Sequence, residues 1–229
     1  PKYPNLVKKF EKAITKLGSK DVVKVEKLKF KRLFFDIETS YNVVSSWRVG
    51  YNLNIGPENI IKERAIICVC WKWAGESKVH SLEWNKGDDK QLLIDFMKVL
   101  STADEISGHN SDRFDLKWVR TRCVYHGVPM FPEYQSIDTL KTIKRQFAFT
   151  SNKLDYVNKV LNLERKQKHE GFPMWSKCYI GDETALKNME RYNIKDVKIL
   201  EDTYLRLRPW IKPHPNVGLF ILDPTASHC

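Results

Sequence analysis

The sequence lacks the marks of a secreted or membrane-bound protein. Its apolar residues, 42% of the chain, never form the run of roughly 18 that a transmembrane helix needs, and no secretory signal opens the chain. The five cysteines are odd in number and scattered, which argues against a disulfide framework. We therefore expect an intracellular, cytoplasmic protein without membrane contact.

Acidic residues are scarce relative to basic ones. The chain has 39 Lys and Arg against 28 Asp and Glu, a net charge of +11. Residues 1–32 alone hold eleven of the basic residues and three of the acids. Such an excess predicts a polyanionic partner, with nucleic acid as the first candidate, and a merely soluble surface as the alternative.

Internal repeats and low-complexity linkers are absent too, so we expect one main domain over residues 29–209. Strands are predicted at 29–38, 65–73, 78–84 and 105–109, with a hairpin turn at Gly75-Glu76. Helical spacing is found at 88–100, 112–126, 137–147, 153–162 and from Asp182 or Thr184 to Arg208. This order predicts an α/β domain with a mixed central sheet flanked by helices.

The two flanking segments have a different character. Residues 1–28 are expected to be a basic arm, with an amphipathic helix over 5–17, and residues 210–229 an extended, proline-rich tail. Pro1 in place of an initiator Met suggests a processed chain or a fragment. His228 and Cys229 could be the first ligands of a zinc module, although a single pair is a weak signal.

The apolar run Leu33-Phe34-Phe35 leads directly into two acids, Asp36 and Glu38. Because residues i and i+2 of a strand point to one face, both carboxylates enter the same small volume. Two like charges so close cost free energy unless a cation lies between them, and oxygen ligands suit Mg²⁺ or Mn²⁺. A solvated strand end with two unrelated acids is the alternative.

Two later segments carry further acids. Asn110 ends a predicted strand and Asp115 lies one turn into the next helix, which brings a carboxylate to the carboxyl edge of the sheet. Tyr192 and Asp196 are four residues apart in the final helix, so the phenol and the carboxylate share a face. Taken singly, Asp115 could be an ordinary first-turn acid and Asp196 a half-exposed helical one.

In the order D-x-E, N-x-x-x-F-D and Y-x-x-x-D, the three segments resemble the motifs of the DEDD exonuclease superfamily in its tyrosine subgroup. The resemblance covers about residues 30–208. Ser136-Ile137-Asp138-Thr139-Leu140 and Ser151-Asn152-Lys153-Leu154-Asp155-Tyr156-Val157 are similar to stretches of the exonuclease domain of B-family DNA polymerases. The overall likeness is to stand-alone exonuclease-like proteins of phages and bacteria.

The resemblance implies a ribonuclease H-like fold and metal-dependent release of nucleotides from a 3′ end, in a bacterial or phage-infected cell. Asp36, Glu38 and Asp196 would bind one Mg²⁺ or Mn²⁺ ion, and Asp36 would share the second, with Asp115 reaching it through water. Tyr192 would orient the attacking water. The residues expected to contact the substrate are Thr39, Asn110, Phe114 and Lys153.

Single-stranded or frayed DNA is the expected substrate. An RNA 3′-trimming enzyme similar to RNase D and a catalytically idle nucleic-acid scaffold remain alternatives, and a DNA polymerase or other replication protein is the expected partner. Trp47 and Tyr51, in the irregular segment after the first motif, could stack on unpaired bases or pack in the core.

Overall fold

A computed structural model describes residues 30–130, 135–167 and 169–212 of the chain. The predicted helix over 5–17 and the predicted proline-rich tail, with its His228-Cys229 pair, lie outside the described residues apart from 210–212. Within the described ranges, no helix is long and apolar enough to cross a membrane.

The core of the molecule is a five-stranded sheet in the order β5-β4-β1-β6-β7. Its strands are β1 (Arg32–Thr39), β4 (Ile66–Trp73), β5 (His80–Glu83), β6 (Glu105–Gly108) and β7 (Gln135–Asp138). Strands β1, β4 and β5 pair in antiparallel fashion, whereas β6 runs parallel to β1 and to β7. The predicted mixed sheet is therefore confirmed, as is the hairpin between β4 and β5.

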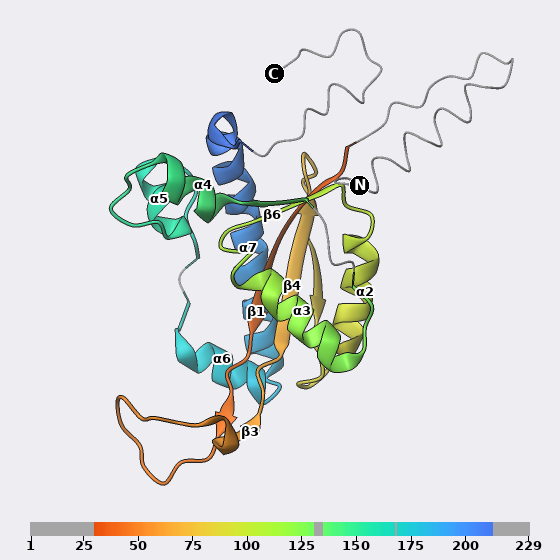
Figure 1. The fold of residues 1–229 in the computed structure, drawn as a ribbon, viewed down its shortest axis with the longest axis vertical. Helices are drawn as coiled ribbons and strands as arrows, with labels where there is room; N and C mark the ends of the chain where they lie inside the picture. The colour runs from red at the N-terminus through yellow and green to blue at the C-terminus, as the bar shows by residue number, and fades with distance from the viewer. Residues whose placement is uncertain (1–29, 131–134, 168, 213–229) are drawn as a thin grey trace, which may run out of the picture.

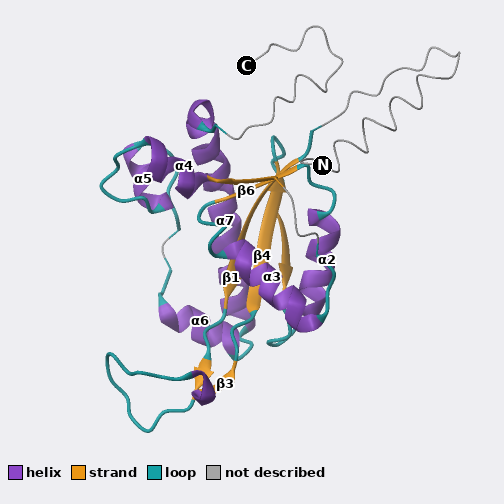
Figure 2. Ribbon diagram, in the orientation of Figure 1, coloured by secondary structure: helices purple, strands orange, loops and turns teal. Residues whose placement is uncertain are grey.

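Helices cover both faces of this sheet (Figures 1 and 2). One face carries α2 (Lys90–Leu100) and α3 (Asp115–His126). The other carries the long helix α7 (Glu183–Leu207), onto which α4 (Thr139–Gln146), α5 (Leu154–Val160) and α6 (Phe172–Tyr179) pack. The architecture is thus a sheet between two helical layers.

The alternation of β1 decides which of its side chains reach which layer. Leu33, Phe35 and Ile37 enter the core under α2 and α3. Phe34 enters the opposite core with Val197 of α7. Because side chains of a strand alternate, Asp36 and Glu38 follow Phe34 to the α7 face.

The structure differs from the predicted elements in four places. Residues 135–138 extend the sheet as β7, because they pair with β6, and the helix predicted from 137 starts at Thr139. Helix α3 starts at Asp115 instead of 112, after a turn in which Asn110 has a φ of 66°. Helix α6 was not predicted, and neither was the small sheet of β2 (Val43–Val44) and β3 (Ile60–Lys62), which follows β1.

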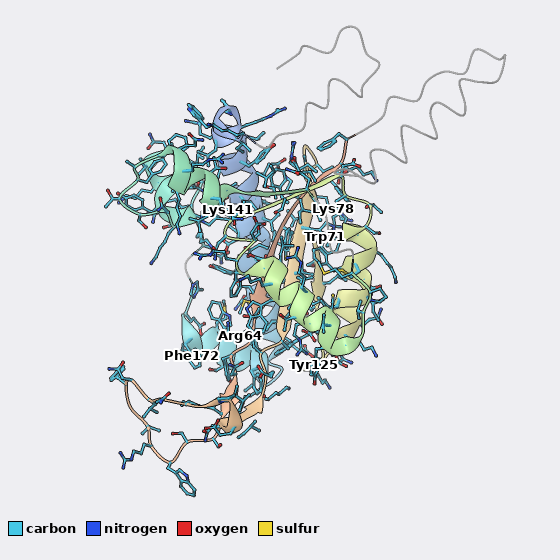
Figure 3. The ribbon with its side chains drawn as sticks, in the orientation of Figure 1. Arg64, Trp71, Lys78, Tyr125, Lys141 and Phe172 are labelled. Atoms are coloured by element: carbon cyan, nitrogen blue, oxygen red, sulfur yellow. The ribbon has the colours of Figure 1, made fainter. Side chains whose placement is uncertain are left out.

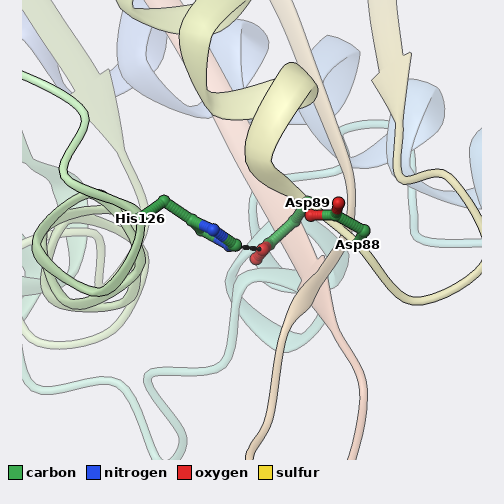
Figure 4. Close-up of side chains that lie close together, drawn as sticks. All are labelled: Asp88, Asp89 and His126. Atoms are coloured by element: carbon green, nitrogen blue, oxygen red, sulfur yellow. Dashed lines mark hydrogen bonds and ion pairs between the residues drawn. The ribbon is translucent and has the colours of Figure 1, made fainter.

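One buried acid joins the helical layer to the sheet (Figure 4). Asp89, which precedes α2, receives two hydrogen bonds from the Arg122 guanidinium, at 2.8 and 2.7 Å, and one from the Ile66 N–H at 2.9 Å. His126 Nε2 lies 2.7 Å from the same carboxylate. Burial would raise the pKa of Asp89, but these hydrogen bonds hold it below its ordinary value. We call this group the Asp89–Arg122 cluster.

Candidate active site

Three carboxylates meet where β1 passes under α7. Oxygen atoms of Asp36, Glu38 and Asp196 all lie within 4.8 Å of one another. Asp36 and Glu38 are opposite Cys70 and Cys68 of β4, and the register shifts immediately after Glu38. Asp196 comes from α7, one helical turn after Tyr192, and both residues are buried. The carboxylates that the sequence spacing predicted to converge therefore lie close together.

The fourth predicted acid, Asp115, is tied to the first motif through the backbone. Its Oδ1 accepts a hydrogen bond of 3.1 Å from the Ile37 N–H, between Asp36 and Glu38. Asp115 is buried and opens α3, so it reaches β1 from the adjoining strand end. It lies outside the group of three within 4.8 Å but close enough to raise the pKa of Asp36.

Burial makes all four acids weaker than in water, and repulsion from the neighbouring site acids adds to this at Asp36 and Glu38. Burial is the largest cause for each: it raises the pKa of Glu38 to about 8 and that of Asp115 to about 7. The pKa of Asp36 is raised well above its ordinary value by burial and then by Asp115 and Asp196. The pKa of Asp196 is raised as well. The site is therefore deficient in positive charge.

Lys166 provides positive charge to this group, and sequence reasoning missed it. Its Nζ forms an ion pair with Asp196 Oδ2 and lies 3.3 Å from the Tyr192 hydroxyl. Burial alone would lower the pKa of Lys166, but Asp196 and Asp36 raise it above its ordinary value. Lys166 therefore stays charged at neutral pH. It belongs to the segment between α5 and α6, where no periodicity or motif spacing marks one lysine among several.

The donor set fits a divalent cation. Asp196 Oδ1 is buried and has no hydrogen-bond partner in the described part of the chain. An orphaned carboxylate oxygen costs free energy, and a hard cation with oxygen ligands would remove that cost. Asp36, Glu38 and Asp196 are the residues that could hold it, since they present one oxygen each to a common point.

A cleft of about 820 Å³ opens beside the acids. Asp36 and Tyr192 border it, together with Asn110 and the lysines Lys144 and Lys153. Two of the predicted substrate residues, Asn110 and Lys153, therefore lie on the cleft. Of the other two, Thr39 is buried directly after Glu38, and Phe114 packs against the core under α3.

The loop that carries Asn110 is fixed by Asp138. The Asn110 N–H donates a 2.9 Å hydrogen bond to Asp138 Oδ1, which also caps α4 through the Leu140 N–H. His109 reaches Thr139 at 3.0 Å and the Asn152 carbonyl at 3.1 Å. Burial lowers the pKa of His109 to about 4, so it is neutral and acts as a hydrogen-bonding spacer.

Helix α6, which the sequence did not reveal, closes the other side of the site. Its Trp175 lies beside Glu38 and, against the larger effect of burial, lowers the pKa of that acid, and His169 makes edge-to-face contacts with Tyr192 and Trp175 at centroid distances of 5.0 Å. Burial, and then Asp196, raise the pKa of Tyr192 above its ordinary value. The phenol therefore keeps its proton at neutral pH, so it can orient a group by hydrogen bonding but does not act as a base.

Comparison with known proteins agrees with this description. The family model of the RNase_H superfamily matches residues 62–208, a range that includes Asp115, Tyr192 and Asp196. The chain is also similar to the family B DNA polymerase from the hyperthermophilic archaeon Pyrobaculum calidifontis, with a TM-score of 0.57 and 20% identity. That match covers 79% of this chain but only 25% of the polymerase. No curated protein sequence matches the chain.

Proposed function

Because the chain belongs to the RNase H superfamily, we propose that it is a metal-dependent 3′→5′ exonuclease of the DEDD tyrosine type, acting on single-stranded or frayed DNA ends. The observation that carries the proposal is the convergence of Asp36, Glu38 and Asp196 within 4.8 Å, with Asp115 hydrogen-bonded beside them. Four acids from three separate segments are withdrawn from water here with one lysine among them, which lowers the stability of the fold. Such a cost is expected where the acids have a function other than stability.

Two divalent ions, Mg²⁺ or Mn²⁺, are the proposed cofactors. When bound, such ions supply a nucleophile at neutral pH and stabilise charge on the attacking and leaving oxygens of a phosphodiester. Asp36, Glu38 and Asp196 would hold the first ion, Asp36 would be shared with the second, and Asp115 would reach the second through water. The arrangement of donors around Asp36 supports this division, since Asp115 and Asp196 are the acids that most raise its pKa.

The side chains divide the remaining tasks. Tyr192, whose pKa is raised, would orient the attacking water and not deprotonate it. Lys166, 3.3 Å from the Tyr192 hydroxyl, would keep the phenol and Asp196 in place. Lys144 and Lys153 on the cleft would bind the phosphates next to the scissile bond, with Asn110 at the sugar or base.

The test is the release of nucleotides from a 3′-labelled single strand by the full chain in Mg²⁺ or Mn²⁺. Asp36→Asn, which keeps the shape of the side chain, should lower the rate by at least about 10³-fold. Asp202→Asn removes an exposed acid from α7 and should change nothing. Equal rates for Asp36→Asn and the wild-type protein would reject the assignment of the site.

Parallel DNA and RNA substrates decide between the DNA exonuclease and the RNA-trimming alternative. A covalently closed circle separates both from an endonuclease, because only an endonuclease can cut it. The wild-type chain should shorten linear DNA from its 3′ end, leave the circle intact, and show no product in EDTA. A protein that binds DNA but releases nothing with either metal would be the idle scaffold.

The structural likeness to a DNA polymerase also supports, as a proposal, action beside a polymerase in a bacterial or phage-infected cell. The matched part is a quarter of the length of that polymerase, so the polymerase partner is proposed from the likeness alone. The net charge of +11 supports a nucleic-acid partner in either case.

A further inference from the structure

The segment between β2 and the short helix before β3 exposes an unusual set of apolar side chains. We call residues 45–56 the aromatic loop. Trp47, Val49 and Tyr51 are fully exposed in it, at 102%, 99% and 99% of their reference area. Single exposed apolar residues are ordinary, but three large ones at alternate positions of one loop mark a surface that binds something.

The base of this loop is well held, so the exposure is not that of a frayed end. The Ser45 N–H donates a 2.8 Å hydrogen bond to the Asn59 carbonyl, and the Asn59 side chain donates one of 3.3 Å to the Ser45 carbonyl. At the tip, Gly50 and Asn52 have positive φ values, which turn the chain. The loop therefore presents its rings on a closed hairpin.

This hairpin is joined directly to the candidate active site. Its first strand follows Thr39, the residue after Glu38, and Tyr41 packs on Phe172 and Tyr179 of α6 with centroid distances of 5.2 and 5.0 Å. Figure 1 shows the loop extending beyond α6 at the end of the sheet where β1 stops, and Figure 3 shows Phe172 on the side of α6 toward it. Trp47 is eight residues beyond Thr39, within about 28 Å of extended chain.

The charge of the loop suits a polyanion. Between residues 41 and 57 the one charged side chain is Arg48, which lies between Trp47 and Val49. Unpaired nucleotides offer ring faces to the aromatic side chains and phosphates to Arg48. Aromatic rings interleaved with a cation, and no acid, are the usual composition of a platform on which bases stack.

We infer that the aromatic loop is a binding site for single-stranded nucleic acid, in which Trp47 and Tyr51 stack on unpaired bases and Arg48 contacts a phosphate. The inference rests on the proposed function for its geometry, because the strand held by the loop is the one whose 3′ end enters the cleft. The loop would grip nucleotides several positions upstream of that end and keep the substrate attached between cuts.

The test separates binding from cleavage. Fluorescence anisotropy in EDTA would follow an oligothymidine and an oligouridine of about 15 nucleotides, with Trp47→Ala, Tyr51→Ala, the double variant, and Trp47→Tyr. Each alanine should weaken binding about fivefold to 100-fold, whereas Trp47→Tyr should retain most of the affinity. Tyr125→Ala, which removes an exposed tyrosine from α3 (Figure 3), is the control and should bind normally.

Equal affinity of the double variant and the wild-type protein for both oligonucleotides would overturn the inference. So would concentration-dependent self-association, by sedimentation, that Trp47→Ala abolishes, because the loop would then contact a second copy. Thermal melting shows that each variant folds. Loop-dependent binding without nucleotide release in Mg²⁺ would instead reject the proposed function, and normal release without loop-dependent binding would reject only the loop.

The length of the substrate provides a second test of the aromatic loop. A substrate of about three nucleotides is too short to reach the loop, so the wild-type protein and the double variant should trim it at the same rate. On longer strands the double variant should release the substrate after fewer cuts. Equal product ladders on long strands would overturn the role of the loop in holding the substrate.

Discussion

The Asp89–Arg122 cluster and the candidate active site both withdraw acids from water, and they are built on opposite principles. In the Asp89–Arg122 cluster one carboxylate receives a bidentate guanidinium, a backbone N–H and a histidine. At the candidate active site four carboxylates have Lys166 among them, and Asp196 Oδ1 has no partner in the described residues. The pKa of Asp89 is lowered, whereas those of the four acids are raised.

This contrast separates an acid that serves the fold from acids that, under the proposed function, would serve a ligand. The Asp89 carboxylate has hydrogen bonds at both oxygens, so a cation brought to it would have to displace an arginine. Although Asp88, Asp89 and His126 lie close enough to hold a metal (Figure 4), the guanidinium already takes that place. Under the proposed function, a bound cation would supply the charge compensation that the active-site acids lack.

The largest effect is expected from breaking the saturated cluster. Arg122→Ala would leave Asp89 buried without its main partner, which should lower the free energy of unfolding by about 3–5 kcal/mol in urea melts. Lys141→Ala removes an exposed ion pair to Asp112 and should cost at most about 1 kcal/mol. Mn²⁺ should not restore Arg122→Ala, and a restoration would show that the cluster is a metal site after all.

A smaller effect is expected from removing the cation of the unsaturated group. In EDTA, Lys166→Met should lower the free energy of unfolding by about 2 kcal/mol, because Asp196 loses its ion pair in a buried position. With saturating Mn²⁺ the difference from the wild-type protein should shrink, because a bound metal replaces the lost charge. A deficit of the same size with and without metal would mean that Lys166 only packs.

The smallest effect is expected from pH on the metal-free protein. Glu38, with a pKa of about 8, and Asp115, with about 7, keep protons that the unfolded chain releases near its ordinary values of 4.5 and 3.8. The folded state thus binds more protons in this window, and stability should fall as pH rises from about 5 to 8, by on the order of 1–2 kcal/mol.

Asp89 acts in the opposite direction, since its lowered pKa contributes stability that is lost only on acidification below its ordinary value. Thermal melting in EDTA across the pH range measures the sum. Mn²⁺ should flatten the fall above pH 5 and should raise the melting temperature more at pH 8 than at pH 6. A stability that instead rises with pH in EDTA would contradict the raised pKa values.

The sequence was sufficient to predict which side chains share a face wherever two site residues lie within one strand or one helix. Asp36 and Glu38 share a face because strands alternate, and Tyr192 and Asp196 because helices repeat, so their convergence was predictable from spacing. The mixed sheet followed from the order of strand and helix patterns. The superfamily match confirms the ribonuclease H-like fold that the motifs implied, while the exonuclease subgroup stays a prediction.

Other features depend on contacts between distant segments. Lys166 reaches Asp196 across 30 residues and Arg122 reaches Asp89 across 33, with nothing in either spacing to mark the pair. The sequence pattern predicts a helix from residue 137, whereas in the structure residues 135–138 form a strand because they pair with β6. Trp175 belongs to a helix of only eight residues, Phe172–Tyr179, which follows Gly171 and is too short to show a clear helical period.

The hydrogen bond from the Ile37 N–H to Asp115 has a consequence for how that carboxylate can be used. Because Oδ1 already accepts this backbone hydrogen bond, Asp115 is less suited than a free carboxylate to chelate a ligand with both oxygens. The same hydrogen bond would fix the side chain of an Asp115→Asn variant in one orientation, because the Ile37 N–H needs an acceptor. Its carbonyl must face Ile37, and its NH₂ group would then point into the site, where a donor would replace an acceptor.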